Sequence, residues 1–270
     1  MLRFDEIGYW SELKLEIVRK YAAAYSRILS RQPGLAHVYV DAFAGAGTHV
    51  SRTTGEFVAG SPLNALSIEP PFREYHLIDL DGDKVARLRA VVGERPDVHV
   101  HHGDCNRILL TDVFPRVRRN QARRGLCLLD PYGLHLDWKV VYTAGQMGTL
   151  EIFLNFPIMD MNRNVLWHNP EPVAPEDLER MDAFWGGDSW RQVAYDTSLN
   201  LFGFPERTPI ETIAEAYRSR LHDVAGFRYV LEPLPMRSSV NTVVYFLFFA
   251  SPNQTGARIV REIFSRYRGR

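Results

Sequence analysis

Hydrophobic and polar positions along this chain follow two periods, which predicts strands that alternate with helices. Short apolar runs end in a carboxylate or a glycine turn at residues 37–41, 75–79, 98–104 and 126–130. Around them lie stretches whose apolar residues recur every three or four positions. Strands that alternate with amphipathic helices are typical of a mostly parallel sheet covered on both faces. The pattern therefore predicts an α/β fold with a Rossmann-like sheet.

The first helix is predicted over residues 10–29, where Leu13 and Ile17 belong to an apolar stripe. Lys14 and other charged residues are expected elsewhere on the helical wheel, away from that stripe. Ser11 is the candidate N-cap. The helix precedes the first strand, so we expect it to lean on the sheet or on a ligand site.

The first strand ends in the run DAFAGAG, which starts at Asp41. Gly45 and Gly47 allow a tight turn and leave the main chain open to a ligand. They match only part of the dinucleotide fingerprint G-x-G-x-x-G, because Val50 stands where the third glycine would fall. The turn by itself is weak evidence for a nucleotide-like ligand, and its value depends on the residues that follow.

The helix after this turn is expected late, because an irregular segment is predicted over residues 48–60. Ser61 and Pro62 then provide an N-cap and a first helical residue. In a dinucleotide site the helix begins at the turn, and its positive end faces the pyrophosphate. The delayed helix disfavours an NAD-dependent enzyme, and the ligand need not carry a phosphate at this point.

Further carboxylates follow the later strands, at the edge where open α/β sheets bind ligands. Asp79 is suited to accept hydrogen bonds from the two hydroxyls of a ribose, with Asp81 as its rival, and either of them could cap a helix. Asp104 could accept from an adenine amino group or cap the next helix. Asp41 could bind an ammonium group through water or only hold the glycine turn.

Composition and charge limit the classes of protein to which this chain can belong. The chain has 270 residues, 46% of them hydrophobic, which suffices for one large domain over 1–270 with a helical insertion at 157–209. Lys+Arg and Asp+Glu both number 32, so binding to nucleic acid through net charge alone is disfavoured. Cys105 and Cys127 give neither a disulfide framework nor a zinc spacing. With no signal peptide and no long apolar run, we expect a soluble, cytoplasmic protein without membrane partners.

The runs VDAFAGAG, YHLIDLD, HHGDCN and LLDPYG, in this order, are similar to the successive motifs of class I S-adenosylmethionine-dependent methyltransferases. More closely, KLEIVRKY, DAFAGAG…GSPLNAL, LLDPYG, EIFLNF…NR and FWGGDSW resemble the three-Cys-motif partner (TcmP) family of bacterial proteins. This resemblance covers nearly the whole chain. It implies a seven-stranded, mostly parallel sheet whose last strand, at 243–250, is antiparallel and forms a hairpin with 227–231.

The resemblance also implies S-adenosylmethionine as the cofactor. The residues expected to contact it lie at the ends of the first four strands. They are Asp41, Phe43, Ala44, Gly45, Gly47, Asp79, Leu80, Asp104, Cys105 and Asp130.

Asp130, Pro131 and Tyr132 form the most informative chemical signal and are the candidate catalytic residues. Methyltransferases that act on nucleobase amines place an Asp/Asn-Pro-Pro-aromatic run after the fourth strand. Acceptors in that run hold the amine hydrogens and favour the tetrahedral nitrogen of the transition state, while the aromatic ring stacks on the base. Here a single proline separates the acid from the aromatic residue, and Gly133 follows.

Candidate substrate-binding residues are Tyr132, His135, Asn155 and Arg163. His135 is a candidate base, and Arg163 suits a carboxylate or phosphate as well as a structural ion pair. His99, His101 and His102 lie close together, but alternation along a strand divides them between two faces, so no metal site is predicted.

Two classes of function agree with these signals. The first is an enzyme that transfers a methyl group from S-adenosylmethionine to a nitrogen, or less readily an oxygen, of a nucleobase, a nucleic acid or a related small molecule. The second is a non-catalytic, methyltransferase-like protein that binds the cofactor or a companion protein. The sequence predicts neither the methyl acceptor nor the oligomeric state.

Overall fold

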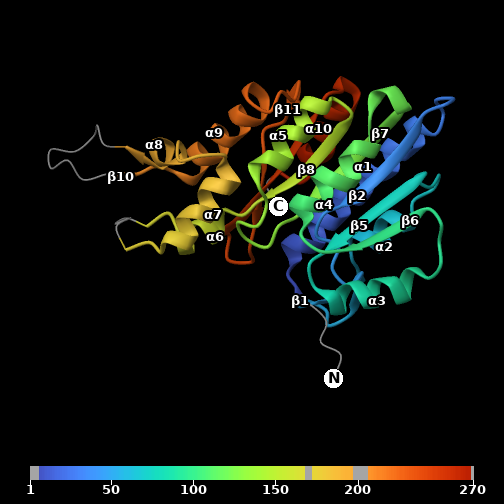
Figure 1. Cartoon of the computed structure of the whole chain (residues 1–270). Helices are drawn as coiled ribbons and strands as arrows, with labels where there is room; N and C mark the ends of the chain where they lie inside the picture. Colours follow the sequence, from blue (N-terminus) through green and yellow to red (C-terminus); the bar gives the residue numbers. More distant parts are fainter. Residues whose placement is uncertain (1–5, 168–171, 197–205, 269–270) are drawn as a thin grey trace.

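An eight-stranded mixed sheet forms the centre of the computed structural model, which describes residues 6–167, 172–196 and 206–268. The strand order is β11-β13-β8-β7-β2-β5-β6, and β12 also pairs with β13. Figure 1 labels β2, β5, β6, β7, β8 and β11 of this sheet. The strands are β2 (Ala36–Asp41), β5 (Glu74–Asp79), β6 (Val98–His102), β7 (Arg123–Leu129), β8 (Leu150–Phe156), β11 (Tyr229–Val230), β12 (Leu234–Arg237) and β13 (Val243–Ser251).

The five strands from β6 to β8 are parallel, and β13 runs antiparallel to β8. Counted along the chain, the parallel strands follow the doubly wound order 3-2-1-4-5. The order reverses between β2 and β7, and such a reversal opens a ligand crevice at the carboxyl ends of the strands. The sheet has eight strands where seven were expected, because both β11 and β12 pair with β13.

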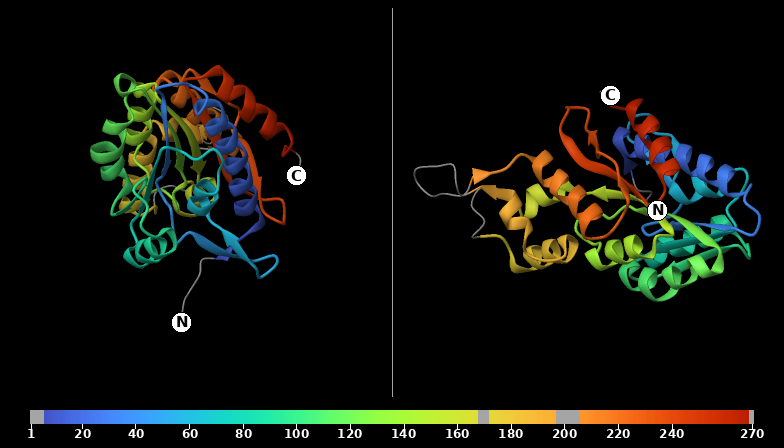
Figure 2. Two further views of the ribbon diagram at one scale, coloured as in Figure 1. Left: turned by 90° about the vertical axis from the view of Figure 1, so that its right-hand side faces the viewer. Right: turned by 90° about the horizontal axis from the view of Figure 1, so that it is seen from above.

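Helices cover both faces of the sheet (Figure 2). One face packs on α1 (Tyr9–Leu29), α2 (Ser61–Leu66), α3 (Gly82–Val92) and α10 (Gln254–Ser265). The other packs on α4 (Cys105–Ile108), η1 (Leu109–Val113), η2 (Phe114–Arg116), α5 (Trp138–Met147) and α9 (Ile210–Asp223). Alternation along β2 explains the two layers, because Val38 and Val40 face the second set of helices while Tyr39 faces the first.

The chain after β8 forms a helical extension over part of the segment predicted as an insertion. It contains α6 (Ile158–Asn164), α7 (Pro175–Trp185), α8 (Trp190–Ala194), β9 (Tyr195–Asp196) and β10 (Glu206–Arg207). Phe184, Trp185 and Trp190 are fully buried in the same core cluster as β8 and α9. These aromatic residues therefore extend the main core, and a role of the segment in substrate access stays a prediction.

The segment 48–60, expected to be irregular, forms a small sheet instead. β3 (Thr48–Ser51) pairs with β4 (Phe57–Ala59) and with β1 (Glu6–Ile7). Gly55 has a φ of +74° in the turn of this hairpin, a conformation that favours glycine. The N-cap of α1 is Gly8 rather than Ser11, because the segment from β1 turns into the helix earlier than expected.

Within the described ranges, no helix has both the length and the apolar character that a membrane-spanning segment requires.

Candidate functional site

The glycine turn after β2 is tied to the end of β5. Gly45 and Gly47 have φ values of +65° and +85°, so both positions require glycine. The Gly45 N–H donates to Asp79 Oδ2 at 2.7 Å, and the Ala44 N–H donates to the Ile78 carbonyl at 2.8 Å. The turn is therefore held at the switch point of the sheet, with Asp79 as one of its supports.

Asp41 lies fully buried beneath this turn. Its Oδ1 accepts from the Phe43 N–H at 3.3 Å, and its Oδ2 has no donor in hydrogen-bonding geometry among the described residues. Burial raises the pKa of Asp41 to about 7, although the nearby Ser61 hydroxyl and the Phe43 amide oppose the rise. A cation beside Asp41 would therefore be stabilised, as the ammonium prediction requires.

Asp79 and Asp81, the two candidate acceptors for the ribose hydroxyls, have different contacts after β5. Asp81 is the N-cap of α3, where it accepts from the backbone N–H groups of Asp83 and Lys84. Asp79 instead faces the glycine turn, and its Oδ1 accepts from the Asp81 N–H at 2.9 Å. A carboxylate oxygen has a second lone pair, so Asp79 retains acceptor capacity for a diol. Its ribose role stays a prediction.

Asp104, predicted for the adenine, and two other predicted cofactor contacts lie after β5 and β6. Asp104 is the N-cap of α4 and accepts from the Asn106 N–H at 2.9 Å. Leu80 is 72% exposed, whereas Cys105 is buried. Burial raises the pKa of the Cys105 thiol to about 12, which keeps it neutral. The contact of Asp104 with adenine, and of Leu80 and Cys105 with the cofactor, stays a prediction.

Asp130 marks the carboxyl end of β7 and joins three elements. Its Oδ1 accepts from Asn155 Nδ2 at 2.9 Å, at the end of β8. Its Oδ2 is bonded to Lys14 Nζ from α1. The Lys14 side chain is 8% exposed, and its Nζ lies 5.3 Å from the centroid of the Tyr245 ring.

The burial of Lys14 corrects its expected place on the polar side of α1. Leu13, Leu15, Ile17 and Val18 are buried around it, so this end of the helix is enclosed on a wider arc than the apolar stripe suggested. Periodicity could not reveal the pairing, because Asp130 is 116 positions away along the chain. The local sign in the sequence that Lys14 could be buried was its position between two leucines, in the run LKL.

The other predicted substrate residues are not gathered around Asp130. Tyr132 is 72% exposed, and Lys84 Nζ lies 5.9 Å from the centroid of its ring. His135 and Arg163 are also exposed, while Pro131 is buried. Of the predicted residues, Asn155 is therefore the one that the structure brings into contact with Asp130.

Buried acceptor oxygens without donors gather at this edge of the sheet. Besides Asp41 Oδ2, they include Asn155 Oδ1 and Asp160 Oδ2 within the described residues. Asp160 belongs to α6, and a Cβ added at Gly133 would lie 2.8 Å from its Oδ2. Sequence reasoning missed Asp160, because nothing in its local pattern shows that α6 returns to the Asp130 loop. Unpaired buried acceptors favour a ligand that donates N–H or O–H groups.

The histidines form a separate cluster on β5 and β6. The ring centroids of His76 and His99 are 5.0 Å apart, and His76 Nδ1 lies 3.1 Å from His101 Nε2. Burial, together with the other histidines, lowers the pKa of His76 to about 4, while Glu74 opposes the shift. No group of three or more metal-ligating side chains in the described part of the chain is arranged to hold a metal ion.

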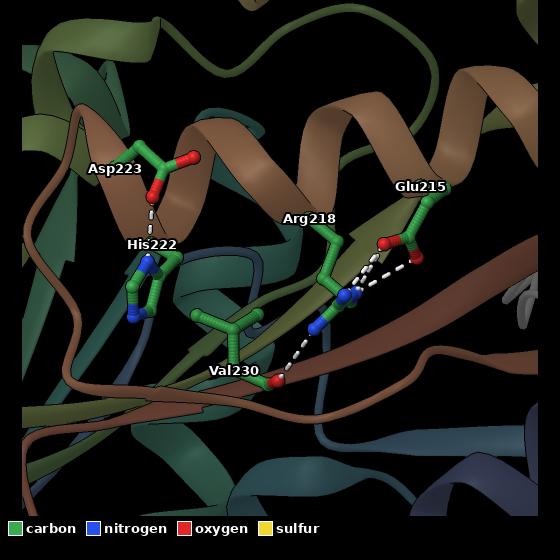
Figure 3. A network of polar contacts seen from close by, with 5 residues as sticks. All are labelled: Glu215, Arg218, His222, Asp223 and Val230. Carbon is green, nitrogen blue, oxygen red and sulfur yellow. Dashed lines mark hydrogen bonds and ion pairs between the residues drawn. The ribbon is translucent and has the colours of Figure 1, made fainter.

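A cavity of about 480 Å³ lies beside β11, the edge strand of the sheet. None of the predicted site residues lines it. One of its walls is Arg218, whose guanidinium donates to both oxygens of Glu215 and to the Val230 carbonyl (Figure 3). The nearby His222 and Asp223 form an exposed pair at 2.7 Å. Because Arg218 already has an acidic partner, this cavity is a weaker candidate than the carboxyl edge.

Comparison with known proteins supports the fold. No family model matches the sequence, and no curated protein matches it. The solved structure of protein LPL1258 from Legionella pneumophila str. Philadelphia 1, of the family DUF519, is similar with a TM-score of 0.56 and 10% identity. The match covers 94% of this chain and 91% of that one. At this identity, the likeness establishes an α/β fold and no more.

Two other similar structures are methyltransferases. The DszA carbon methyltransferase has a TM-score of 0.44 and 16% identity, and the match covers 89% of this chain but 54% of that one. An S-adenosylmethionine-dependent methyltransferase from Mesorhizobium loti has a TM-score of 0.38 and 12% identity, with 86% and 99% covered. TM-scores this low say nothing about the function of this chain. Its resemblance to the TcmP family stays a prediction.

Proposed function

We propose that this protein is an S-adenosylmethionine-dependent methyltransferase that methylates a nitrogen of a nucleobase, a nucleic acid or a related small molecule. The observation that carries the proposal is the contact between Asp130 and Asn155 at the carboxyl ends of two neighbouring strands, beside the glycine turn. This edge is where doubly wound sheets bind nucleotide-like ligands.

The residues present suit the cofactor. Asp41, whose buried Oδ2 has no donor in the described structure, would hold the ammonium group of the cofactor. Asp79 would accept from the ribose hydroxyls, and the backbone at Gly45 and Gly47 would lie against the ligand. When bound, S-adenosylmethionine supplies an electrophilic methyl group.

The residues around Asp130 would bind and orient the amine that receives this group. Asp130 accepts one N–H, and Asn155 Oδ1, which has no donor among the described residues, accepts the other. Two acceptors that hold the N–H groups favour a tetrahedral nitrogen, in which the lone pair is no longer conjugated with the ring and can attack the methyl group. Most of the rate enhancement would come from positioning the amine for an in-line displacement.

A screen with radiolabelled S-adenosylmethionine against nucleosides, tRNA and DNA tests this function. In Asp130→Ala, turnover of the acceptor found should fall about 10²-fold or more, with cofactor affinity near wild type. Asp130→Asn should retain the geometry but lose the anionic acceptor. Asp112→Ala, an exposed aspartate on η1, is the matched control.

Activity that survives Asp130→Ala would refute the catalytic assignment. Cofactor binding without methylation of any screened molecule would favour the alternative, a non-catalytic protein that binds the cofactor or a companion protein.

A further inference from the structure

Lys14 is the one buried charged residue contributed by α1, and it takes part in none of the steps proposed so far. Its ammonium group bonds to Asp130 Oδ2, while Asn155 Nδ2 bonds to Asp130 Oδ1. The three side chains form a chain of contacts from α1 through β7 to β8. The far end of that chain is Asn155 Oδ1, a buried oxygen without a donor among the described residues.

The charge of Lys14 determines the chemistry of Asp130. A carboxylate paired with a buried ammonium group has only lone pairs to offer, since an ionised carboxyl group has no proton to donate. The side-chain amide of Asn155 has a donor end and an acceptor end. Facing an acceptor-only partner, it must direct its NH2 group toward Asp130 and its oxygen away.

We propose that Lys14 is a positioning residue that fixes the orientation of the Asn155 amide, so that Oδ1 faces the amine to be methylated. The inference rests on the proposed function for the identity of the ligand. The orientation of the amide follows from the contacts themselves. Lys14 would thereby make the site select an acceptor that donates N–H groups.

Loss of the ammonium group removes this selection. Without Lys14, Asp130 Oδ2 loses its partner on α1, and the carboxylate is no longer fixed against Asn155 Nδ2. The amide is then not held in one orientation and can present its NH2 group to the substrate in place of its oxygen. In that orientation two donors would face each other, and the amine would lose its second acceptor.

The side-chain amide of Asn155 reports on this directly. In protein labelled with ¹⁵N-asparagine, the Asn155 signal is assigned by its disappearance in Asn155→Ala. One of its protons should resonate far downfield and exchange slowly, because it is hydrogen-bonded to a carboxylate. Lys14→Met should shift that proton upfield and accelerate its exchange with water.

Controls separate positioning from general damage. Lys14→Arg keeps the charge and should keep the downfield signal. Lys20→Met removes a lysine from the same helix that pairs with Glu16 on the surface, and should leave the signal unmoved. If Lys14→Met does not fold, Lys14→Gln provides the same test with a polar side chain. An Asn155 signal that is the same in wild type and in the folded, uncharged Lys14 variant overturns the proposal.

The NMR result stands apart from the proposed function, because it needs no methyl acceptor. With an acceptor in hand, Lys14→Met should lower kcat by roughly tenfold or more, as expected for a misplaced reacting group, while the affinity for S-adenosylhomocysteine stays near wild type. If the signal moves as expected but no molecule is methylated, Lys14 fixes the amide and the methyltransferase assignment is wrong.

Discussion

Replacement of Asp41 by asparagine should change how the stability of this protein depends on pH. Asp41 is fully buried, and its pKa is raised from 3.8 to about 7, mainly because burial penalises the charged form. The folded state therefore binds this proton more tightly than the unfolded state. The stability that the proton contributes is complete below pH 3.8 and is lost as the pH rises through about 7.

The size of the effect follows from the shift. A rise of roughly three pKa units, at about 1.4 kcal/mol each, corresponds to about 4 kcal/mol over the whole range. Most of this, about 3 kcal/mol, falls between roughly pH 5 and pH 8. Asparagine does not titrate, so the variant should gain about that much relative to wild type over this interval.

Urea unfolding of wild type and Asp41→Asn at both pH values measures the difference. Glu151, whose pKa burial also raises to about 7, remains in both proteins, so its contribution cancels. Glu151→Gln is the control, because it should remove a pH dependence of the same sign without affecting the glycine turn. An equal difference in unfolding free energy at the two pH values would refute the reasoning about Asp41.

Three further substitutions test individual contacts. Asp79→Ala should weaken S-adenosylhomocysteine binding by about 1–3 kcal/mol, while Asp81→Ala should lower stability through the loss of the α3 N-cap and leave that affinity unchanged. Equal affinities in the two variants, measured by calorimetry, would remove Asp79 from the cofactor site. Gly133→Ala, at a φ of +70° and with its Cβ 2.8 Å from Asp160 Oδ2, should lower the melting temperature, and a temperature equal to wild type would show that the loop rearranges freely.

The strands that carry the site could be predicted from the sequence. β2, β5, β7 and β8 are apolar runs buried on both faces, and each is followed by a polar residue or a turn. Such runs can be recognised from adjacent residues alone, and they leave few alternatives to a buried strand. The hairpin of β3 and β4 was missed because it depends on pairing with β1, far away in sequence.

The same limit applies to the side chains of the site. The sequence placed Asp41, Asp79 and Asp130 at strand ends, because that position depends on local pattern alone. It could not show that Asp81 caps α3 while Asp79 supports the turn, since both follow the same strand. Lys14 and Asp160 reach the site through the packing of α1 and α6, which no local period encodes.

Calorimetric titration of the wild-type protein with S-adenosylhomocysteine tests the central claim most directly. The account predicts saturable binding of one molecule per chain, weakened in Asp79→Ala. At pH 7 it also predicts the release of a fraction of a proton, since an ammonium group beside Asp41 favours the carboxylate form. Titrations in buffers of different ionisation enthalpy measure that release, which should vanish in Asp41→Asn. Absence of binding, or binding that neither substitution affects, would contradict the assignment of this edge of the sheet as the cofactor site.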